Sequence, residues 1–204
     1  MEFTTTARVL RGVGGLYLIR LADGEKHPDT PSPLAGRSVL CRARGSIRGG
    51  GKLMVGDLVT VTYSESSFEM TADGAVPRDD SAGLPDMAIS SILPRKNALI
   101  RPPMANLDVM FISMAAASPA PVLPTIDKLI CIAEHNDIEP VIIIGKCDLA
   151  PDYAKELQKI YQKAGYEAFV LSAKTGEGTD AIREYVNTRL DGKTSAFAGA
   201  SGIG

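Results

Sequence analysis

PVIIIGKCDL, residues 140–149, is the stretch of sequence from which the fold can be worked out. Its apolar run, residues 141–144, shows no polar alternation, which is typical of a strand buried on both faces of a sheet. The run is followed at once by Gly145, Lys146, Cys147 and Asp148. Open parallel sheets bind ligands at the carboxyl ends of their strands, so these four residues are binding-site candidates. Lys-x-Asp after a strand is common, however, and its neighbours decide the interpretation.

Strand-like and helix-like segments alternate on both sides of this stretch. Apolar segments typical of strands are LDVMFISMA (107–115), YEAFVLSA (166–173) and TSAFAG (194–199). Segments with apolar residues at helical spacing are LPTIDKLICIAEHN (123–136), DYAKELQKIYQKAG (152–165) and TDAIREYVNTRL (179–190). This alternation predicts an α/β fold with a parallel sheet covered by helices on both faces.

Two further predicted strands also end in chemically suggestive residues. The strand at 166–173 leads into Ser172, Ala173 and Lys174, and the strand at 194–199 leads into Gly199, Ala200, Ser201, Gly202, Ile203 and Gly204. Each group also has an ordinary structural explanation. The first could be only a helix start capped by Thr175 or Thr179, and the second could be a flexible Gly-rich tail.

The order of the motifs favours a nucleotide site over these explanations. Lys-x-Asp followed by a helix, a strand and Ser-Ala-Lys is the guanine-reading pair of P-loop GTPases. Asp148 would accept hydrogen bonds from guanine N1–H and the 2-amino group, which adenine cannot supply. The stem of Lys146 can lie along the base face, and the Ala173 N–H can donate to the guanine carbonyl oxygen.

The last six residues supply the phosphate half of such a site. Gly199-x-x-x-x-Gly204 has the spacing of a phosphate-binding loop, which continues as Lys-Ser or Lys-Thr. Its glycines allow successive backbone N–H groups to point at phosphate oxygens, while the following Lys and hydroxyl serve phosphate and Mg²⁺. The three motifs together are specific, although each alone is weak.

The first third of the chain has a β pattern. Short runs rich in Val, Leu, Ile, Thr and Tyr occur at 7–20, 37–44 and 57–66 and predict a small barrel. Turn-forming Pro, Asp and Gly residues follow. We therefore divide the chain into a barrel at 1–75, a linker at 76–105 and part of the α/β domain at 106–204.

Composition excludes several classes of protein. The net charge of -2 argues against a general nucleic-acid binder, although residues 37–52 are basic and contain no acidic residue. Cys41, Cys131 and Cys147 are scattered, so we expect no disulfide and no metal site among these residues. No apolar run approaches the ~18 residues of a membrane span. A cytoplasmic location without membrane contact is the expectation.

Guanine-reading motifs that precede the phosphate loop indicate a circular permutation. With an N-terminal barrel, this order resembles the ribosome small subunit-dependent GTPase A family. The resemblance rests on KLMVGDLVTV (52–61), ISSILPRKNALIRPPMANLD (89–108), GKCDL (145–149), LSAKTGEG (171–178) and LDGKTSAFAGASGIG (190–204). It extends over nearly the whole chain.

The resemblance implies an N-terminal OB-fold barrel, part of a circularly permuted P-loop GTPase domain, and a zinc-binding domain outside these residues. It also implies GTP or GDP with Mg²⁺, a monomer, and action in late maturation of the small (30S) ribosomal subunit. By position, residues 145–148 and 172–174 would read guanine and residues 199–204 would hold phosphate. The resemblance assigns no catalytic residue here.

OB barrels bind RNA through basic grooves and exposed aromatic faces. The basic stretch therefore predicts contacts with ribosomal RNA from Arg37, Arg42, Arg44, Arg48 and Lys52, although a solvated loop face would explain it equally well.

This sequence departs from the family pattern in two ways. Gly145 stands where Asn is usual, so a bond to the five-membered ring of guanine, or a tether to the phosphate loop, is lost. The phosphate-loop Lys, the magnesium ligands and the switch regions are not among these 204 residues. We therefore expect this stretch alone not to hydrolyse GTP and to leave a sheet edge exposed. A non-catalytic RNA-binding module, or a permuted GTPase of the large subunit, which would lack the barrel, remain alternatives.

Overall fold

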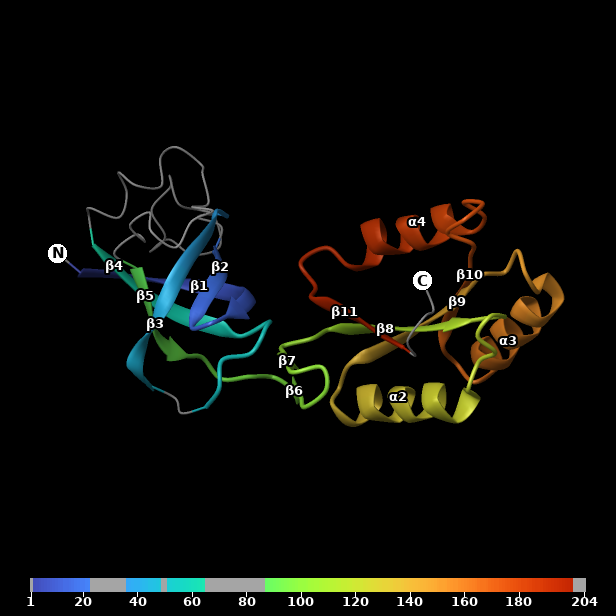
Figure 1. Cartoon of the computed structure of the whole chain (residues 1–204), viewed down its shortest axis with the longest axis horizontal. Helices are drawn as coiled ribbons and strands as arrows, with labels where there is room; N and C mark the ends of the chain where they lie inside the picture. The colour runs from blue at the N-terminus through green and yellow to red at the C-terminus, as the bar shows by residue number, and fades with distance from the viewer. Residues whose placement is uncertain (1, 23–35, 49–50, 65–86, 200–204) are drawn as a thin grey trace. The chain divides into compact units, whose positions relative to one another are not determined.

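The computed structural model describes residues 2–22, 36–48, 51–64 and 87–199 (Figure 1). The chain divides into two compact units, Met1–Asn106 and Leu107–Gly204. Each unit has its own hydrophobic core.

The first unit contains a closed five-stranded barrel. Its strands are β1 (Glu2–Val13), β2 (Leu16–Leu21), β3 (Ser38–Arg48), β4 (Leu58–Ser64) and β5 (Met87–Ile92). They follow the order β1-β2-β3-β5-β4, and the antiparallel pairing of β4 with β1 closes the barrel. Among these strand pairs, only β3 and β5 are parallel, and the other pairs are antiparallel. The predicted OB-fold barrel is therefore confirmed.

Alternation along the strands fills the barrel. Apolar residues at every second position point inward, and the fully buried ones include Ile19, Cys41, Val59, Val61 and Ile89. Burial raises the pKa of the Cys41 thiol to about 12, so this cysteine is a neutral core residue. Several residues between the inward-facing ones are exposed, among them Thr4, Arg20, Arg42 and Arg44, whereas Thr5 and Thr62 are buried.

The expected linker at 76–105 differs from the structure in its second half. Met87–Ile92 forms β5, a strand of the barrel, and β6 (Ala98–Leu99) pairs with β7 (Met104–Ala105) as a small hairpin. Met87 and Ile89 alternate with half-buried neighbours, and both are buried in the barrel core. This alternation covers only a few residues and is surrounded by prolines, so the sequence pattern obscured it.

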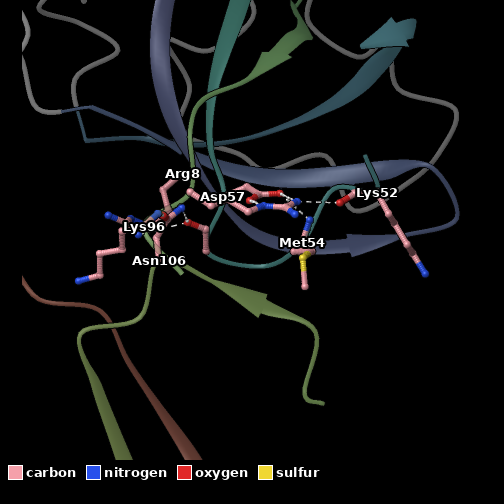
Figure 2. A network of polar contacts seen from close by, with 8 residues as sticks. Arg8, Lys52, Met54, Asp57, Lys96 and Asn106 are labelled. Carbon is pink, nitrogen blue, oxygen red and sulfur yellow. Dashed lines mark hydrogen bonds and ion pairs between the residues drawn. The ribbon is translucent and has the colours of Figure 1, made fainter. Parts of the chain in front are cut away.

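An ion pair between the partly exposed Arg95 and the buried Asp57 joins the segment between β5 and β6 to the loop before β4 (Figure 2). The Asp57 side chain is 0% exposed, and its two oxygens accept hydrogen bonds from Arg95 Nε at 2.6 Å and Arg95 Nη2 at 2.8 Å. The Met54 N–H donates to the same carboxylate at 2.7 Å, and Arg95 Nη2 also donates to the Lys52 carbonyl oxygen at 2.8 Å. Hydrogen bonding to Asp57 raises the pKa of Arg95 above its usual value. Every charge in this pair is therefore neutralised by a partner.

A second set of bonds extends this network to the end of the unit. Asn106 Nδ2 donates to the Gly56 carbonyl oxygen at 3.0 Å, and the Lys96 N–H donates to Asn106 Oδ1 at 2.9 Å (Figure 2). Gly56 has a φ of 91°, and a Cβ there would lie 2.0 Å from the Ala105 carbonyl oxygen. Only glycine allows this close approach between the two segments.

The second unit is a parallel sheet covered on both faces. Along the chain lie β8 (Val109–Ala115), α2 (Leu123–His135), β9 (Glu139–Gly145), α3 (Pro151–Lys163), β10 (Glu167–Val170), α4 (Thr179–Arg189) and β11 (Ser195–Gly199). The strand order is β10-β9-β8-β11, and every pair is parallel. Helices α2 and α3 lie on one face and α4 lies on the other (Figure 1). This is the predicted α/β architecture.

The apolar run at 141–144 occupies the centre of this sheet. Val141 and Ile143 pack toward α4 with Phe111 and Tyr185, while the intervening Ile142 and Ile144 are also fully buried. Both faces of β9 are therefore covered, as the lack of polar alternation predicts. This packing fixes the position at which β9 ends and the Gly145–Asp148 turn begins.

Candidate nucleotide-binding site

A cavity of about 490 Å³ opens at the carboxyl ends of β8, β9 and β10. Six of the residues that the sequence nominated line it, namely Gly145, Lys146, Asp148, Ser172, Ala173 and Lys174. They come from the turns that follow β9 and β10, which are neighbours in the sheet. Parallel pairing therefore brings together side chains more than 20 residues apart in sequence.

Asp148 is held in one orientation by Ser172. The Ser172 side chain is fully buried, and its Oγ donates to Asp148 Oδ1 at 2.7 Å. The Thr175 N–H donates in turn to Ser172 Oγ at 3.3 Å, which directs the hydroxyl proton toward the carboxylate. Asp148 itself is half-buried at the cavity wall. A fixed, half-buried carboxylate is suited to reading adjacent N–H donors on a planar base.

The turn that carries Ser172 closes on itself. The Ser172 N–H donates to the Glu177 carbonyl oxygen at 2.9 Å, and the Gly176 N–H donates back to the Ser172 carbonyl oxygen at 2.8 Å. Gly178 caps α4 with a φ of 73°, and a Cβ there would lie 2.0 Å from the Val170 carbonyl oxygen. The sequence Ser-Ala-Lys-Thr-Gly-Glu-Gly thus forms a compact loop that positions Ser172 and Ala173.

Lys146 connects the β9 turn to the loop after β8. Its backbone has a φ of 57°, uncommon for a residue with a side chain, and its Nζ donates to the Ser118 carbonyl oxygen. Ser118 also has a positive φ, of 50°. The ammonium group therefore lies at the rim of the cavity, between two loops that the sheet brings side by side.

Cys147 does not line the cavity. Its side chain is buried, and its N–H donates to the Leu171 carbonyl oxygen at 3.3 Å. Burial, reinforced by the negative charge of Glu177, raises the pKa of the thiol. Because the thiolate is the nucleophilic form, Cys147 is a spacer between Lys146 and Asp148 and is unsuited to nucleophilic chemistry.

Gly199 is the last described residue of β11, and Ala200, Ser201, Gly202, Ile203 and Gly204 lie outside the described residues. Gly199 pairs with Ser113 on β8, so the end of β11 lies at the same sheet edge as the cavity. Sequence reasoning missed Ser113, Met114 and Phe197, which also line the cavity. Their only signal is that they belong to strands whose ends meet there.

The proposed RNA-contacting residues lie on the barrel unit. Arg42 and Arg44 are exposed on the outer side of β3, opposite the buried Cys41, whereas Arg37 is half-buried. The side chain of Arg48 lies outside the described part of the chain. Lys52 is exposed and lines a second cavity, of about 430 Å³, beside the β1–β2 turn. These residues therefore do not form one continuous row along a single strand.

Aromatic side chains for stacking on bases are few in this barrel. Tyr63 is buried and its ring stacks on Phe3 with centroids 5.7 Å apart, so it belongs to the core. Tyr17 is half-buried and lines the cavity beside the β1–β2 turn. It is therefore the described barrel tyrosine that is placed to meet a ligand.

No group of three or more His, Cys, Asp or Glu side chains among the described residues could hold a metal ion. In the same residues, no helix is both long and apolar enough to cross a membrane.

An OB barrel followed by a parallel sheet, in which the Lys-x-Asp and Ser-Ala-Lys turns precede the Gly-rich end of β11, defines the fold of a circularly permuted GTPase. Residues 92–204 match the family described as RsgA GTPase. The chain therefore belongs to the RsgA GTPase family, as the motifs predicted.

Curated relatives and solved structures agree with this assignment. The small ribosomal subunit biogenesis GTPase RsgA of Agathobacter rectalis is 32% identical over 201 residues, and that of Caldanaerobacter subterraneus subsp. tengcongensis is 34% identical over 199 residues. The matches cover 98% and 97% of this chain but only 59% and 56% of the relatives. The chain thus spans less than two thirds of their length.

Two crystal structures resemble the whole chain. YloQ, a circularly permuted GTPase, is 25% identical with a TM-score of 0.67 over 98% of this chain and 61% of its own. YjeQ from Thermotoga maritima is 29% identical with a TM-score of 0.72 over 99% of this chain and 62% of its own.

Proposed function

We propose that the intact protein binds GTP and GDP in the cavity at the ends of β8, β9 and β10, and that it hydrolyses GTP. The observation that carries this proposal is the Asp148 carboxylate held by Ser172 Oγ at 2.7 Å on the cavity wall. Asp148 would accept from guanine N1–H and the 2-amino group. Lys146 would cover the base face, and the Ala173 N–H would donate to O6.

The phosphates would extend from the base toward the end of β11. The β8 strand separates β9 from β11 in the sheet, so a nucleotide with its base beside β9 and β10 has room to lie along the strand ends. Residues 199–204 would hold the phosphates through backbone N–H groups. Mg²⁺ would accompany the nucleotide, and Zn²⁺ would belong to a separate domain.

We further propose that the intact protein acts in late maturation of the small (30S) ribosomal subunit. The relatives carry the name small ribosomal subunit biogenesis GTPase, and the barrel presents the exposed cations Arg42, Arg44 and Lys52. Contacts of these cations with phosphates of ribosomal RNA would give salt-dependent binding. We expect a monomer in the cytoplasm. The barrel itself argues against the large-subunit alternative.

Replacing Asp148 tests the base-reading role. In the intact protein, Asp148→Asn should weaken GDP binding at least about 100-fold, because the side-chain amide cannot accept from both guanine donors. The same variant should gain affinity for xanthosine diphosphate, whose C2 carbonyl can accept from the new amide. Fluorescence titration with each nucleotide measures the two affinities.

Asp152→Asn is the matched control, because Asp152 is exposed in the first turn of α3 and does not line the cavity. Unchanged GDP affinity in Asp148→Asn would overturn the proposal for the site.

The ribosomal role has a separate test, since the rate of GTP hydrolysis should rise when purified small subunits are added. An equal rate with and without subunits would contradict it.

A further inference from the structure

Gly145 is a glycine that the fold does not require. Gly56 and Gly178 have positive φ values, and a Cβ at either would lie 2.0 Å from a carbonyl oxygen. Gly145 has no such φ, and its nearest obstacle would be the Met114 carbonyl oxygen at an ordinary contact distance of 3.6 Å. A side chain could therefore start from this position. With glycine, the space that such a side chain would fill stays open.

This open space belongs to the nucleotide cavity. Gly145 ends β9, and Ser113 and Met114, near the end of β8, line the same cavity. The groups that would read guanine, Asp148 and Ser172, lie on the other side, toward β10. The side chain missing from Gly145 therefore leaves room on the β8 side of the base.

The position of the base follows from the proposed function, on which this inference rests. With N1 and the 2-amino group at Asp148 and O6 at Ala173, the six-membered ring of guanine lies toward β10. The five-membered ring then points across the end of β9 toward β8, in the direction of the phosphate loop after β11. N7 is adjacent to O6 on this ring, so N7 is directed at the space beside Gly145.

We infer that the site accepts guanine nucleotides that carry an alkyl group on N7, and that Gly145 is the residue that determines this tolerance. A methyl group on N7 would occupy the volume that a side chain at residue 145 would otherwise fill.

Competition binding to the intact protein with GDP and 7-methyl-GDP tests the inference. The wild type should bind the two nucleotides with dissociation constants within about threefold of each other. Gly145→Asn should bind GDP several-fold more tightly, because the amide can reach the five-membered ring. The same variant should bind 7-methyl-GDP about tenfold or more weakly, because the methyl group would be forced into space that the side chain fills. Gly145→Ala fills only part of the space and should lie between these two.

Each outcome decides a different point. The inference is wrong if the wild type binds 7-methyl-GDP more than about tenfold more weakly than GDP. The space beside Gly145 would then be filled by something else, such as an ordered water bound to N7. It is also wrong if Gly145→Ala and Gly145→Asn leave the ratio of the two constants unchanged. If GDP itself does not bind, the proposed function fails first. Thermal unfolding followed by circular dichroism checks that each variant is folded. The ratio of the two dissociation constants in the wild type tests the inference without any variant.

Discussion

The barrel and the sheet unit each contain an aspartate held by hydrogen bonds, but the two aspartates have different surroundings. Asp57 is 0% exposed, and both of its oxygens are bonded to Arg95. Asp148 is half-buried, its Oδ1 accepts from Ser172, and the side chain lines an open cavity. The first carboxylate therefore stabilises its unit, whereas the second is positioned to meet a ligand. Surroundings, and not residue type, separate the structural group from the candidate functional one.

The largest expected effect comes from removing the partner of the buried carboxylate. Arg95→Ala should lower the free energy of unfolding of the barrel by about 3–5 kcal/mol, because Asp57 is left charged and buried with only the Met54 N–H as a hydrogen-bond donor. Ser172→Ala should lower stability by only about 1 kcal/mol, since Asp148 can still be hydrated from the cavity. Urea denaturation followed by far-UV circular dichroism measures both.

An exposed ion pair of equal length is the control for Arg95→Ala. Arg183 and Asp180 are also 2.6 Å apart, but their side chains are 68% and 93% exposed. Arg183→Ala should change stability by less than about 0.5 kcal/mol. If Arg95→Ala were equally mild, Asp57 would not be acting as a buried charge, and the contrast with Asp148 would disappear.

The two tightly packed glycines give the next largest effects. Gly56→Ala and Gly178→Ala should each cost about 2–3 kcal/mol, because a positive φ and a contact of 2.0 Å with a carbonyl oxygen both oppose a Cβ. Only Gly178→Ala should also weaken GDP binding, because a Cβ at Gly178 would press on the Val170 carbonyl oxygen, directly before the loop that holds Ser172. Equal nucleotide affinities in the two variants would mean that this loop does not position the site. Gly145→Ala, with 3.6 Å of clearance, is the matched mild substitution.

Much of the sheet unit could be predicted from sequence, because its strands are buried on both faces and read as uninterrupted apolar runs. The turns after β9 and β10 were also nominated, since parallel strands place their ends together. The bond between Ser172 and Asp148 could not be predicted, because it depends on how the 172–178 loop folds back on itself. The missed strand β5 and the Asp57–Arg95 pair share another cause. Both join segments far apart in sequence, and no local pattern records the partner.

High pH should lower the stability of each unit through different residues. Burial raises the pKa of Cys41 from 9.0 to about 12 in the barrel, and those of Tyr161 and Tyr185 from 10.0 to about 12 in the sheet unit. A raised folded-state pKa means that stability is fully present below the unfolded-state value and is lost as pH rises toward the folded-state value. Stability should therefore fall from about pH 9 in the barrel and from about pH 10 in the sheet unit, by about 1.4 kcal/mol per pH unit for each titrating group.

Urea denaturation at a series of pH values, read for each unit, measures this loss. Cys41→Ala should flatten the profile of the barrel between about pH 9 and pH 10, and Tyr161→Phe should reduce the slope of the sheet unit above about pH 10. A profile of the barrel that is unchanged in Cys41→Ala would show that the thiol is not the titrating group.

The smallest expected effect concerns the two stacked aromatic pairs. Phe197, 71% exposed on β11, stacks on Phe111 with ring centroids 5.0 Å apart, while Phe3 stacks on the buried Tyr63 in the barrel. Phe197→Thr should cost only about 0.5–1 kcal/mol, because threonine suits a strand and little apolar surface is lost from the core. Phe3→Thr should cost more, since its ring covers the closed barrel. If Phe197→Thr proved the more damaging change, this ring would pack more tightly than its exposure indicates. Its place in the cavity wall would then have to be explained by stability and not by ligand contact.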